Sequence, residues 1–347
     1  MLAVLLAILL LLPAVAHADE ITVKGDTLKG TVKSLTGEDV EFETVYGKGT
    51  LSIPYADVER LDTEGAYRVF HGGGETRGRL TGVEDGAVVL TTADGTTERI
   101  ATASIDEVYS EQDIADSFAT RLHADLPYWS AEASTGLSLT RARVDTTAYA
   151  AGFRAERKRA PTRFLVVGDY TYSTQKEEGQ DSTKLTDDAA GQVRFEYDFA
   201  QDWFAYGNGT AEYDAIQRLS IRGVPEAGLG YRLYETKDSF WSVYGGGAWV
   251  YERYFDGTHN DYASVVFGTE TELALPYDAT FRAGATYLPA LDDWQNDYLI
   301  RSYASLSVPV WKMIAMKASL VDDYDSTPAP DTPPNSLSLL LGLALTF

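Results

Sequence analysis

The amino-acid sequence predicts an all-β protein: a transmembrane β-barrel of about twelve antiparallel strands, preceded by a small all-β domain in the periplasm. The closing segment, Asn335 to Phe347, alternates large apolar side chains with small or polar ones and ends on an aromatic residue. Beyond residue 18, no apolar run approaches the ~20 residues that a membrane-spanning helix needs. A membrane protein without such helices must satisfy its backbone hydrogen bonds by closing a barrel.

Residues 1–18 are expected to form a signal peptide. Met1 to Val15 is apolar, and Ala16-His17-Ala18 matches the A-x-A pattern of a cleavage site. The run is also shorter than a spanning helix requires, which argues against a membrane anchor. The mature chain is therefore expected to begin at Asp19.

Composition excludes several kinds of function. The chain has no cysteine, which rules out disulfides, thiolate metal sites and a cysteine nucleophile. A net charge of -23 argues against nucleic acid as a partner, because binding phosphates requires clustered Lys and Arg. The 22 tyrosines suit a membrane protein, since tyrosine is favoured where lipid meets water. No cofactor is expected.

The region from Asp19 to Glu111 contains an internal duplication with a period of 47 to 48 residues. Gly25–Gly30 recurs as Gly74–Gly78, and further apolar positions recur at the same spacing. Each copy alternates apolar and polar residues between glycine-rich turns, which predicts four or five strands. We expect two tandem SH3-like or Sm-like repeats, residues 19–65 and 66–111, that act as a spacer or a peptide-binding module. Residues 112–127 are expected to connect them to the barrel, with one helical turn.

From residue 128 onward the sequence changes to longer alternating segments, of the length that tilted transmembrane strands need. The alternation is cleanest between Gln192 and Phe199, where odd positions from Val193 are apolar or aromatic and even positions are polar. The expected strands are 129–140, 147–158, 162–173, 189–199, 202–214, 219–234, 239–254, 261–275, 279–291, 297–310, 313–324 and 336–347.

The connections between these segments predict which end of the barrel faces the cell. Five are short, such as Ala200-Gln201, and they alternate with connections that are mostly longer and polar, such as 175–188. Outer-membrane barrels place short turns in the periplasm and longer loops outside. The first strand is therefore expected to start in the periplasm, where the N-terminal repeats also lie.

Several motifs in residues 129–347 resemble the YdiY-type family of salt-induced outer-membrane proteins, a family defined by a domain of unknown function. They are Tyr197-Asp198, Trp203–Tyr206, Gly228–Arg232, Tyr287–Pro289, Leu306–Pro309 and Asp323–Pro328. The resemblance implies an outer-membrane location and induction by envelope stress, and it implies no activity, because none is established for the family. The N-terminal repeats resemble a periplasmic extension that some members carry.

The candidate site is the barrel lumen, because the alternation turns charged side chains inward. The candidate lumen-lining residues are Arg194, Glu196, Arg222, Glu226, Arg232, Glu270, Glu272, Arg282, Arg301 and Lys317. Glu132, Arg154, Glu156 and Arg163 also fall on inward positions. One interpretation is a water-filled pore that prefers cations. The other is a lumen filled by interlocking salt bridges and tyrosines, which passes nothing.

An enzyme is not expected. A lipase-like or acyltransferase-like barrel needs a histidine beside a serine, with an orienting Asn or Asp. Of the four histidines, His17 lies in the signal peptide, His71 in the second repeat, His123 in the connector and His259 in an outer loop.

The outer loops are acidic, as at Asp187-Asp188 and Asp292-Asp293. Ca²⁺ or Mg²⁺ bridging to lipopolysaccharide is one interpretation, and a solvated charged surface is the other.

The sequence therefore predicts a small passive pore or an envelope-maintenance protein that acts under salt or acid stress. The alternative is a non-conducting anchor whose repeats bind a periplasmic protein or peptidoglycan. The expected partners are outer-membrane lipid, lipopolysaccharide and, during biogenesis, the barrel-assembly machinery. Leu343, Leu345 and Phe347 are the candidate assembly signal, and the last strand must pair with the first so that no edge stays open.

Overall fold

The computed structural model describes residues 18–35, 39–47, 49–140, 144–177, 181–236, 238–311, 313–328 and 333–346. The chain divides into two compact units, and the second unit begins at Tyr128. Most of the expected signal peptide, and Phe347 of the expected assembly signal, lie outside the described residues.

The first unit begins with a five-stranded antiparallel sheet in the order β4-β3-β2-β1-β5. Its strands are β1 (Asp19–Val23), β2 (Asp26–Leu35), β3 (Asp39–Thr44), β4 (Thr50–Pro54) and β5 (Val58–Asp62). A short 3-10 helix, η1 (Tyr55–Asp57), joins the last two. Lys24 and Gly25 take positive φ in the β1–β2 turn, which is why a glycine belongs in this tight turn.

A second sheet repeats this arrangement in the order β10-β6-β7-β8-β9. Its strands are β6 (Tyr67–His71), β7 (Gly74–Glu84), β8 (Ala87–Thr91), β9 (Thr97–Ala101) and β10 (Ile105–Ser110), with η2 (Thr102–Ser104) before the last. Because each strand of the first sheet has a counterpart at the same place in the second, the duplication seen in the sequence is a duplication of structure. The SH3-like or Sm-like form stays a prediction.

The two sheets share one hydrophobic core rather than holding two separate ones. Fully buried side chains from both copies, including Phe42 and Leu80, belong to a single cluster. A buried carboxylate also connects the two sheets. Asp19 Oδ2, in the first sheet, accepts hydrogen bonds from the Tyr67 hydroxyl of the second sheet at 2.5 Å and from the Val32 amide at 3.0 Å. Burial and the neighbouring Asp19 carboxylate raise the pKa of Tyr67 well above its ordinary value, so its hydroxyl remains a donor.

The connector contains two helices where the sequence analysis expected a single helical turn. They are α2 (Glu111–Asp116) and α3 (Phe118–Asp125). Each starts at a serine whose hydroxyl caps it, since Ser110 accepts from the Asp113 amide at 2.9 Å and Ser117 from the Thr120 amide at 3.3 Å. The second cap, at Ser117, restarts the helix within a segment that was expected to hold only one turn.

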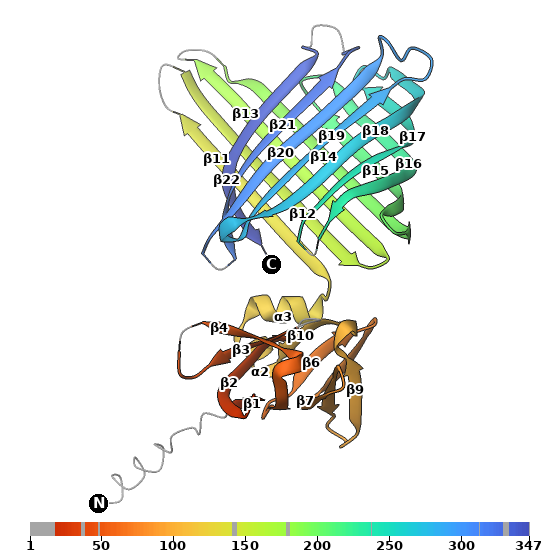
Figure 1. Cartoon of the computed structure of the whole chain (residues 1–347). Coiled ribbons are helices and arrows are strands. Elements are labelled where there is room, and N and C mark those ends of the chain that lie inside the picture. The colour runs from red at the N-terminus through yellow and green to blue at the C-terminus, as the bar shows by residue number, and fades with distance from the viewer. Residues whose placement is uncertain are drawn as a thin grey trace, which may run out of the picture. The chain divides into compact units, whose positions relative to one another are not determined.

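The second unit is a closed barrel of twelve antiparallel strands in sequence order (Figure 1), as predicted. They are β11 (Trp129–Thr140), β12 (Val144–Arg159), β13 (Thr162–Glu177), β14 (Thr183–Ala200), β15 (Trp203–Asp214), β16 (Leu219–Glu235), β17 (Phe240–Tyr254), β18 (His259–Leu275), β19 (Ala279–Pro289), β20 (Tyr298–Trp311), β21 (Ile314–Asp325) and β22 (Asn335–Thr346). A 3-10 turn, η3 (Pro276–Asp278), joins β18 to β19. In the part of the chain that the structure covers, no helix has the length and apolar character needed to cross a membrane.

Several strands extend beyond the predicted bounds, so the loops between them are shorter than expected. β14 begins at Thr183 rather than at residue 189, and Lys184 and Asp187 are paired with β13. Apolar alternation marks only the part of a strand that meets lipid, whereas backbone pairing continues past it into water. We call the end with the short β12–β13 and β14–β15 turns the turn end, and the opposite end the loop end.

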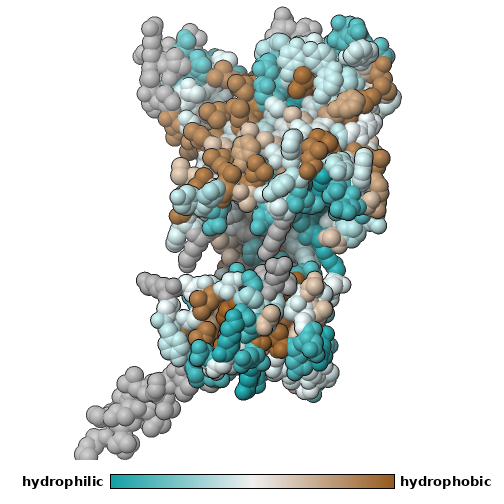
Figure 2. Space-filling model, viewed as in Figure 1, coloured by the Kyte–Doolittle hydropathy of each residue, from teal (hydrophilic) through white to brown (hydrophobic). Residues whose placement is uncertain are grey.

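The outer surface of the barrel is apolar. Val193, Phe195 and Tyr197 on β14 are each nearly half exposed, although they alternate with buried charged residues. Figure 2 shows apolar side chains gathered on the outside of the barrel strands. Aromatic pairs such as Trp203–Tyr231 near the turn end and Tyr213–Phe255 near the loop end suit the two boundaries of an apolar layer.

Candidate functional site

The structure places all the candidate lumen-lining residues on the inner wall of the barrel. Arg194 and Glu196 are only 2% exposed, although Phe195 between them is 47% exposed on the outer face. The strict alternation along β14 produces this difference. The other candidates lie on β16, β18, β19, β20 and β21 and also face inward: Arg222, Glu226, Arg232, Glu270, Glu272, Arg282, Arg301 and Lys317.

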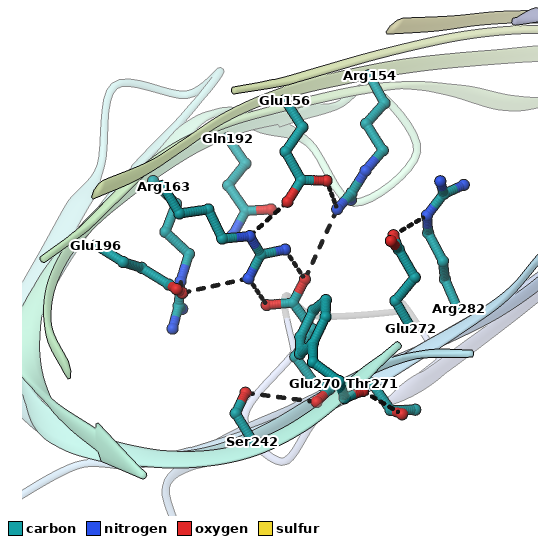
Figure 3. A network of polar contacts seen from close by, with 12 residues as sticks. Arg154, Glu156, Arg163, Gln192, Glu196, Ser242, Glu270, Thr271, Glu272 and Arg282 are labelled. Atoms are coloured by element: carbon teal, nitrogen blue, oxygen red, sulfur yellow. Dashed lines mark hydrogen bonds and ion pairs between the residues drawn. The ribbon is translucent and has the colours of Figure 1, made fainter. Parts of the chain in front are cut away.

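Arg163 is the centre of an ion-pair network that crosses the lumen (Figure 3). Its Nη2 donates to Glu270 Oε1 at 3.0 Å, its Nε to Glu156 Oε1 at 2.5 Å, and its Nη1 to Glu196 Oε1 at 3.4 Å. Arg163 lies on β13 and Glu270 on β18, which stand on nearly opposite walls of the barrel. The guanidinium also lies over the Phe240 ring at 4.5 Å. The network therefore spans the lumen instead of coating one wall.

Two more arginines extend this network over β14 and β16. Arg194 donates from Nε to Glu196 at 2.7 Å, and its guanidinium is held between the rings of Tyr206 and Tyr244 at 4.4 and 4.3 Å. Arg232 pairs with Glu196 at 3.3 Å and with Asp198 at 2.5 Å. Glu196 is thus shared by three arginines.

On the other side of the lumen, the network continues to β11, β19 and β21. Arg282 donates to Glu272 at 2.6 Å and to Glu132 at 3.2 Å, and Lys317 lies 2.5 Å from the same Glu132. We name this whole network the ion-pair plug. Its members are Glu132, Arg154, Glu156, Lys158, Arg163, Arg194, Glu196, Asp198, Arg232, Glu270, Glu272, Arg282 and Lys317.

An apolar cluster fills another part of the lumen. Phe204, Val224, Val250 and Val266 are fully buried and pack together with inward-facing tyrosines. The alternation along the strands predicts tyrosines in the lumen, but it does not single out these valines. A few apolar residues at inward positions carry no distinctive signal, because valine also occurs on the outward face, as at Val193.

The remaining space forms a cavity of about 380 Å³ in the loop half of the barrel, which we name the vestibule. Small residues such as Gly136, Ala150, Gly152 and Ser338 line one side of it. A second cavity of about 150 Å³ lies toward the turn end. Arg154 and Arg282 line both cavities, and we name these two residues the partition.

A second ionic cluster stands beside the vestibule near the loop end. Arg222 donates to Glu252 at 2.6 Å and to Asp325 at 2.6 Å, and Arg301 donates to Glu212 at 2.6 Å. Its basic groups are fully occupied by carboxylates. This cluster ties β16 and β20 to their partners without crossing the plug.

Two central members of the plug, Arg163 and Glu156, are absent from the set of candidates that the sequence emphasised. Their inward positions were predicted, but their convergence was not. Alternation along a strand predicts which face of the barrel a side chain occupies. Its ion-pair partner across the lumen depends on the tilt of the strands and on how the barrel closes. The acidic stretches of the predicted outer loops do not add a metal site within the described residues, where no group of three or more His, Asp or Glu is placed to hold an ion.

Leu343 and Leu345, the two described residues of the candidate assembly signal, lie on the outer face of β22. Leu343 is 55% exposed and Leu345 is 58% exposed, and both pair with β11, opposite Thr135 and Ala133. The last strand therefore joins the first, as the sequence predicted. Recognition of these residues by an assembly machinery stays a prediction.

Comparisons with known proteins concern mainly the barrel. A family model described as "Protein of unknown function, DUF481" matches residues 133–347. Among solved structures, the NanC porin is similar with a TM-score of 0.38 and 11% identity, over 63% of this chain and 100% of that one. The translocator domain of the autotransporter NalP from Neisseria meningitidis is similar with a TM-score of 0.33 and 14% identity, over 67% and 96% of the two chains. No curated protein matches the sequence.

Proposed function

The chain belongs to the DUF481 family of proteins of unknown function, and we propose that it is an outer-membrane β-barrel whose lumen is closed to free ion flow at rest. The apolar outer surface and the closed ring of twelve strands support insertion into a bilayer, because pairing between neighbouring strands supplies backbone hydrogen bonds that lipid cannot. A single-chain barrel with an even number of strands is typical of the outer membrane of a Gram-negative envelope.

The ion-pair plug is the observation that carries this proposal. A permeating ion must pass the partition formed by Arg154 and Arg282, and each guanidinium is held by carboxylates. Arg154 Nη2 lies 3.1 Å from Glu156, and Arg282 is paired with Glu272 and Glu132. Moving one arginine leaves buried carboxylates without their partners, which costs several kcal/mol.

The N-terminal unit is proposed to lie in the periplasm and to bind the barrel to a partner there. The unit leads directly into β11, which starts at the turn end, and outer-membrane barrels keep their short turns in the periplasm. The duplicated sheets would hold a periplasmic protein or peptidoglycan, with the barrel as the anchor. Leu343, Leu345 and Phe347 would present the assembly signal, and outer-membrane lipid and lipopolysaccharide would surround the barrel.

Single-channel recording on the purified protein in planar bilayers tests this proposal. We expect no steady conductance across a wide range of salt concentrations, because the plug closes the lumen. Insertion is verified separately, by protection of the barrel from protease in the same lipid. Sustained openings of the inserted wild-type protein would contradict a closed lumen.

A small passive pore is the second candidate, and the two cavities that share Arg154 and Arg282 in their lining favour it. Movement of these two side chains would connect the vestibule with the turn end. The double variant Arg154→Ala/Arg282→Ala is expected to conduct, with a preference for cations because it leaves an excess of carboxylates. The matched control Arg253→Ala, at an exposed position of β17, should behave as wild type.

Deleting residues 19–125 distinguishes an anchor from a pore. We propose that the truncated barrel still folds, because the hydrophobic core of the first unit contains only residues of that unit. Under salt or acid stress, loss of the protective effect with an intact barrel favours the anchor. Protection retained by the barrel alone favours permeation. A non-enzymatic role is proposed in both cases, since His71, His123 and His259 all lie outside the lumen network.

A further inference from the structure

The seam that closes the barrel is only partly paired. β11 pairs with β22 over Glu132–Thr135, opposite Leu343–Thr346. On its other side β11 pairs with β12 along its whole length, and β22 pairs with β21 from Asn335 onward. Within the described strands, residues 136–140 and 335–342 therefore have no pairing across the seam. In Figure 1 the two strands meet toward the turn end and run apart toward the loop end.

Two glycines mark the point where the strands begin to separate. A Cβ on Gly342 would lie 2.3 Å from the Thr135 carbonyl oxygen, and one on Gly136 would lie 2.8 Å from the Leu341 carbonyl oxygen. The backbones are in close contact there, and only glycine permits it. Beyond this point no pairing joins residues 137–140 to residues 335–340 across the seam. We name this unpaired stretch the seam portal.

The seam portal connects two different environments. On the inside, Ser336, Ser338 and Leu340 of β22 line the vestibule. On the outside, Leu137 is 70% exposed and Leu339 is 66% exposed, on the face that would meet lipid. The unpaired stretch thus lies between the polar lining of the vestibule and the apolar outer surface of the barrel.

Unpaired backbone groups in the portal call for a polar partner. Amides and carbonyls of a strand edge are costly to leave unsatisfied in hydrocarbon. Water from the vestibule, or the polar head of a bound molecule, can satisfy them from inside, while an apolar chain fits between the outward leucines. Because the plug bars the route to the turn end, the portal gives the vestibule a route into the membrane.

The charges that line the vestibule restrict the head group. Its basic residues are all occupied in ion pairs: Arg154, Arg222, Arg282, Arg301 and Lys317. Asp169, Asp188 and Asp323 line the same cavity, and none of them forms an ion pair within the described residues. The charge that remains uncompensated is negative, which disfavours a purely anionic head.

We propose that the seam portal is a lateral binding site for a single-chain amphiphile, with its zwitterionic or cationic head in the vestibule and its chain between β11 and β22. This inference rests on the membrane insertion proposed above. It adds a route between the vestibule and the bilayer that does not pass the plug.

Paired cysteines test the opening, because the native chain has none. Continuing the register of the paired segment would bring Leu139 opposite Leu339, both on the outward face. In lipid vesicles with a membrane-permeant oxidant, Leu139→Cys/Leu339→Cys is expected to stay reduced, since a disulfide requires closely approaching Cβ atoms. The matched control Ala133→Cys/Leu345→Cys lies in the paired segment on the same face and should oxidise fully.

A photoreactive lysophosphatidylcholine, with its reactive group in the acyl chain, tests the ligand. We expect it to label the inward Ser338 and Leu340 in wild-type protein, and excess unlabelled lysophosphatidylcholine should compete. Joining the two cysteines of Leu139→Cys/Leu339→Cys with a short bis-maleimide should abolish this inward label and leave the label on outward leucines.

Either of two results overturns the proposal. One is equal oxidation of the test and control pairs, which would show a closed seam. The other is labelling confined to outward residues and unchanged by the bis-maleimide. Protection of the barrel from protease in the same vesicles shows that it is inserted, so a failed portal is distinguishable from a failed membrane location. Competition by lysophosphatidylglycerol as strong as by lysophosphatidylcholine would contradict the expected head group.

Discussion

At the scale of single residues, Arg163 does more than any other side chain to define the lumen. It joins Glu156 and Glu196 on the two neighbouring strands, β12 and β14, and Glu270 across the barrel. An ion pair buried in this way is not a large net source of stability compared with apolar packing. It does, however, make the loss of one partner severe, because the other charges remain buried.

We expect Arg163→Met to destabilise the barrel by about 3–5 kcal/mol, the usual effect of removing one partner of a buried ion pair. Urea unfolding followed by tryptophan fluorescence measures this, since all six tryptophans lie at or after Trp129 and report on the barrel alone. The double variant Arg163→Met/Glu270→Met should recover part of the loss.

The exposed Arg253 provides the control for this prediction. Arg253→Met makes the same chemical change and should shift the urea midpoint by much less. Equal effects of the two substitutions would show that Arg163 is not a buried hub.

His123 supplies a pH-dependent prediction in the connector. Burial lowers the pKa of this histidine, whose ring stacks on Tyr109 with 6.5 Å between centroids. A folded-state pKa below the ordinary value means that the stabilisation is complete above pH ~6.5 and is lost as the pH falls through the folded-state pKa. Hydrogen exchange in α2 and α3 should therefore speed up, after correction for intrinsic rates, between about pH 7.5 and 5.

A His123→Phe variant should lose this pH dependence while keeping the ring stacked on Tyr109. If wild type and variant respond equally to pH, the titrating group is another one.

At the scale of elements, the sequence predicted the strands well because a barrel wall imposes a strict alternation. The twelve strands, their order and their inward and outward faces follow from it. Bounds were predicted less well: β12, β13 and β14 all extend further toward the loop end than the alternation indicated. Thr183 and Lys184 face opposite sides of β14, and both are polar. Without alternation between apolar and polar residues, the sequence does not distinguish a strand that continues beyond the membrane from a loop.

Close approach at the seam gives a prediction for β22. Gly342→Ala would place a methyl group against the Thr135 carbonyl, so we expect a loss of about 1–3 kcal/mol, typical of overpacking. The fraction of barrel that resists unfolding in SDS without heating measures this. Gly207→Ala on β15 is the control, because nothing lies within 4 Å of its Cβ position. Equal resistance of the two variants would mean that β11 and β22 do not approach closely at this point.

At the scale of the whole molecule, local patterns predicted the parts but not what they form together. The duplication predicted two small β-repeats, yet not that both copies contribute to one core, since Ile21 and Val88 meet only after folding. The same holds for the lumen. Alternation along the strands predicts that Arg163 and Glu270 face inward. Their contact also requires β13 and β18 to face each other across the lumen, which depends on the size of the barrel.

We propose that the ion-pair plug divides the lumen into two compartments, and two positions on β11 test this division. Ser134 lines the vestibule and Ser130 lines the smaller cavity, so the two inward serines lie on opposite sides of the partition. The measurement is the reaction of Ser134→Cys and Ser130→Cys with a membrane-impermeant maleimide, added to one side of vesicles that hold the protein in a single orientation. We expect Ser134→Cys to react only from the loop side and Ser130→Cys only from the turn side. Reaction of both variants from the same side would contradict it.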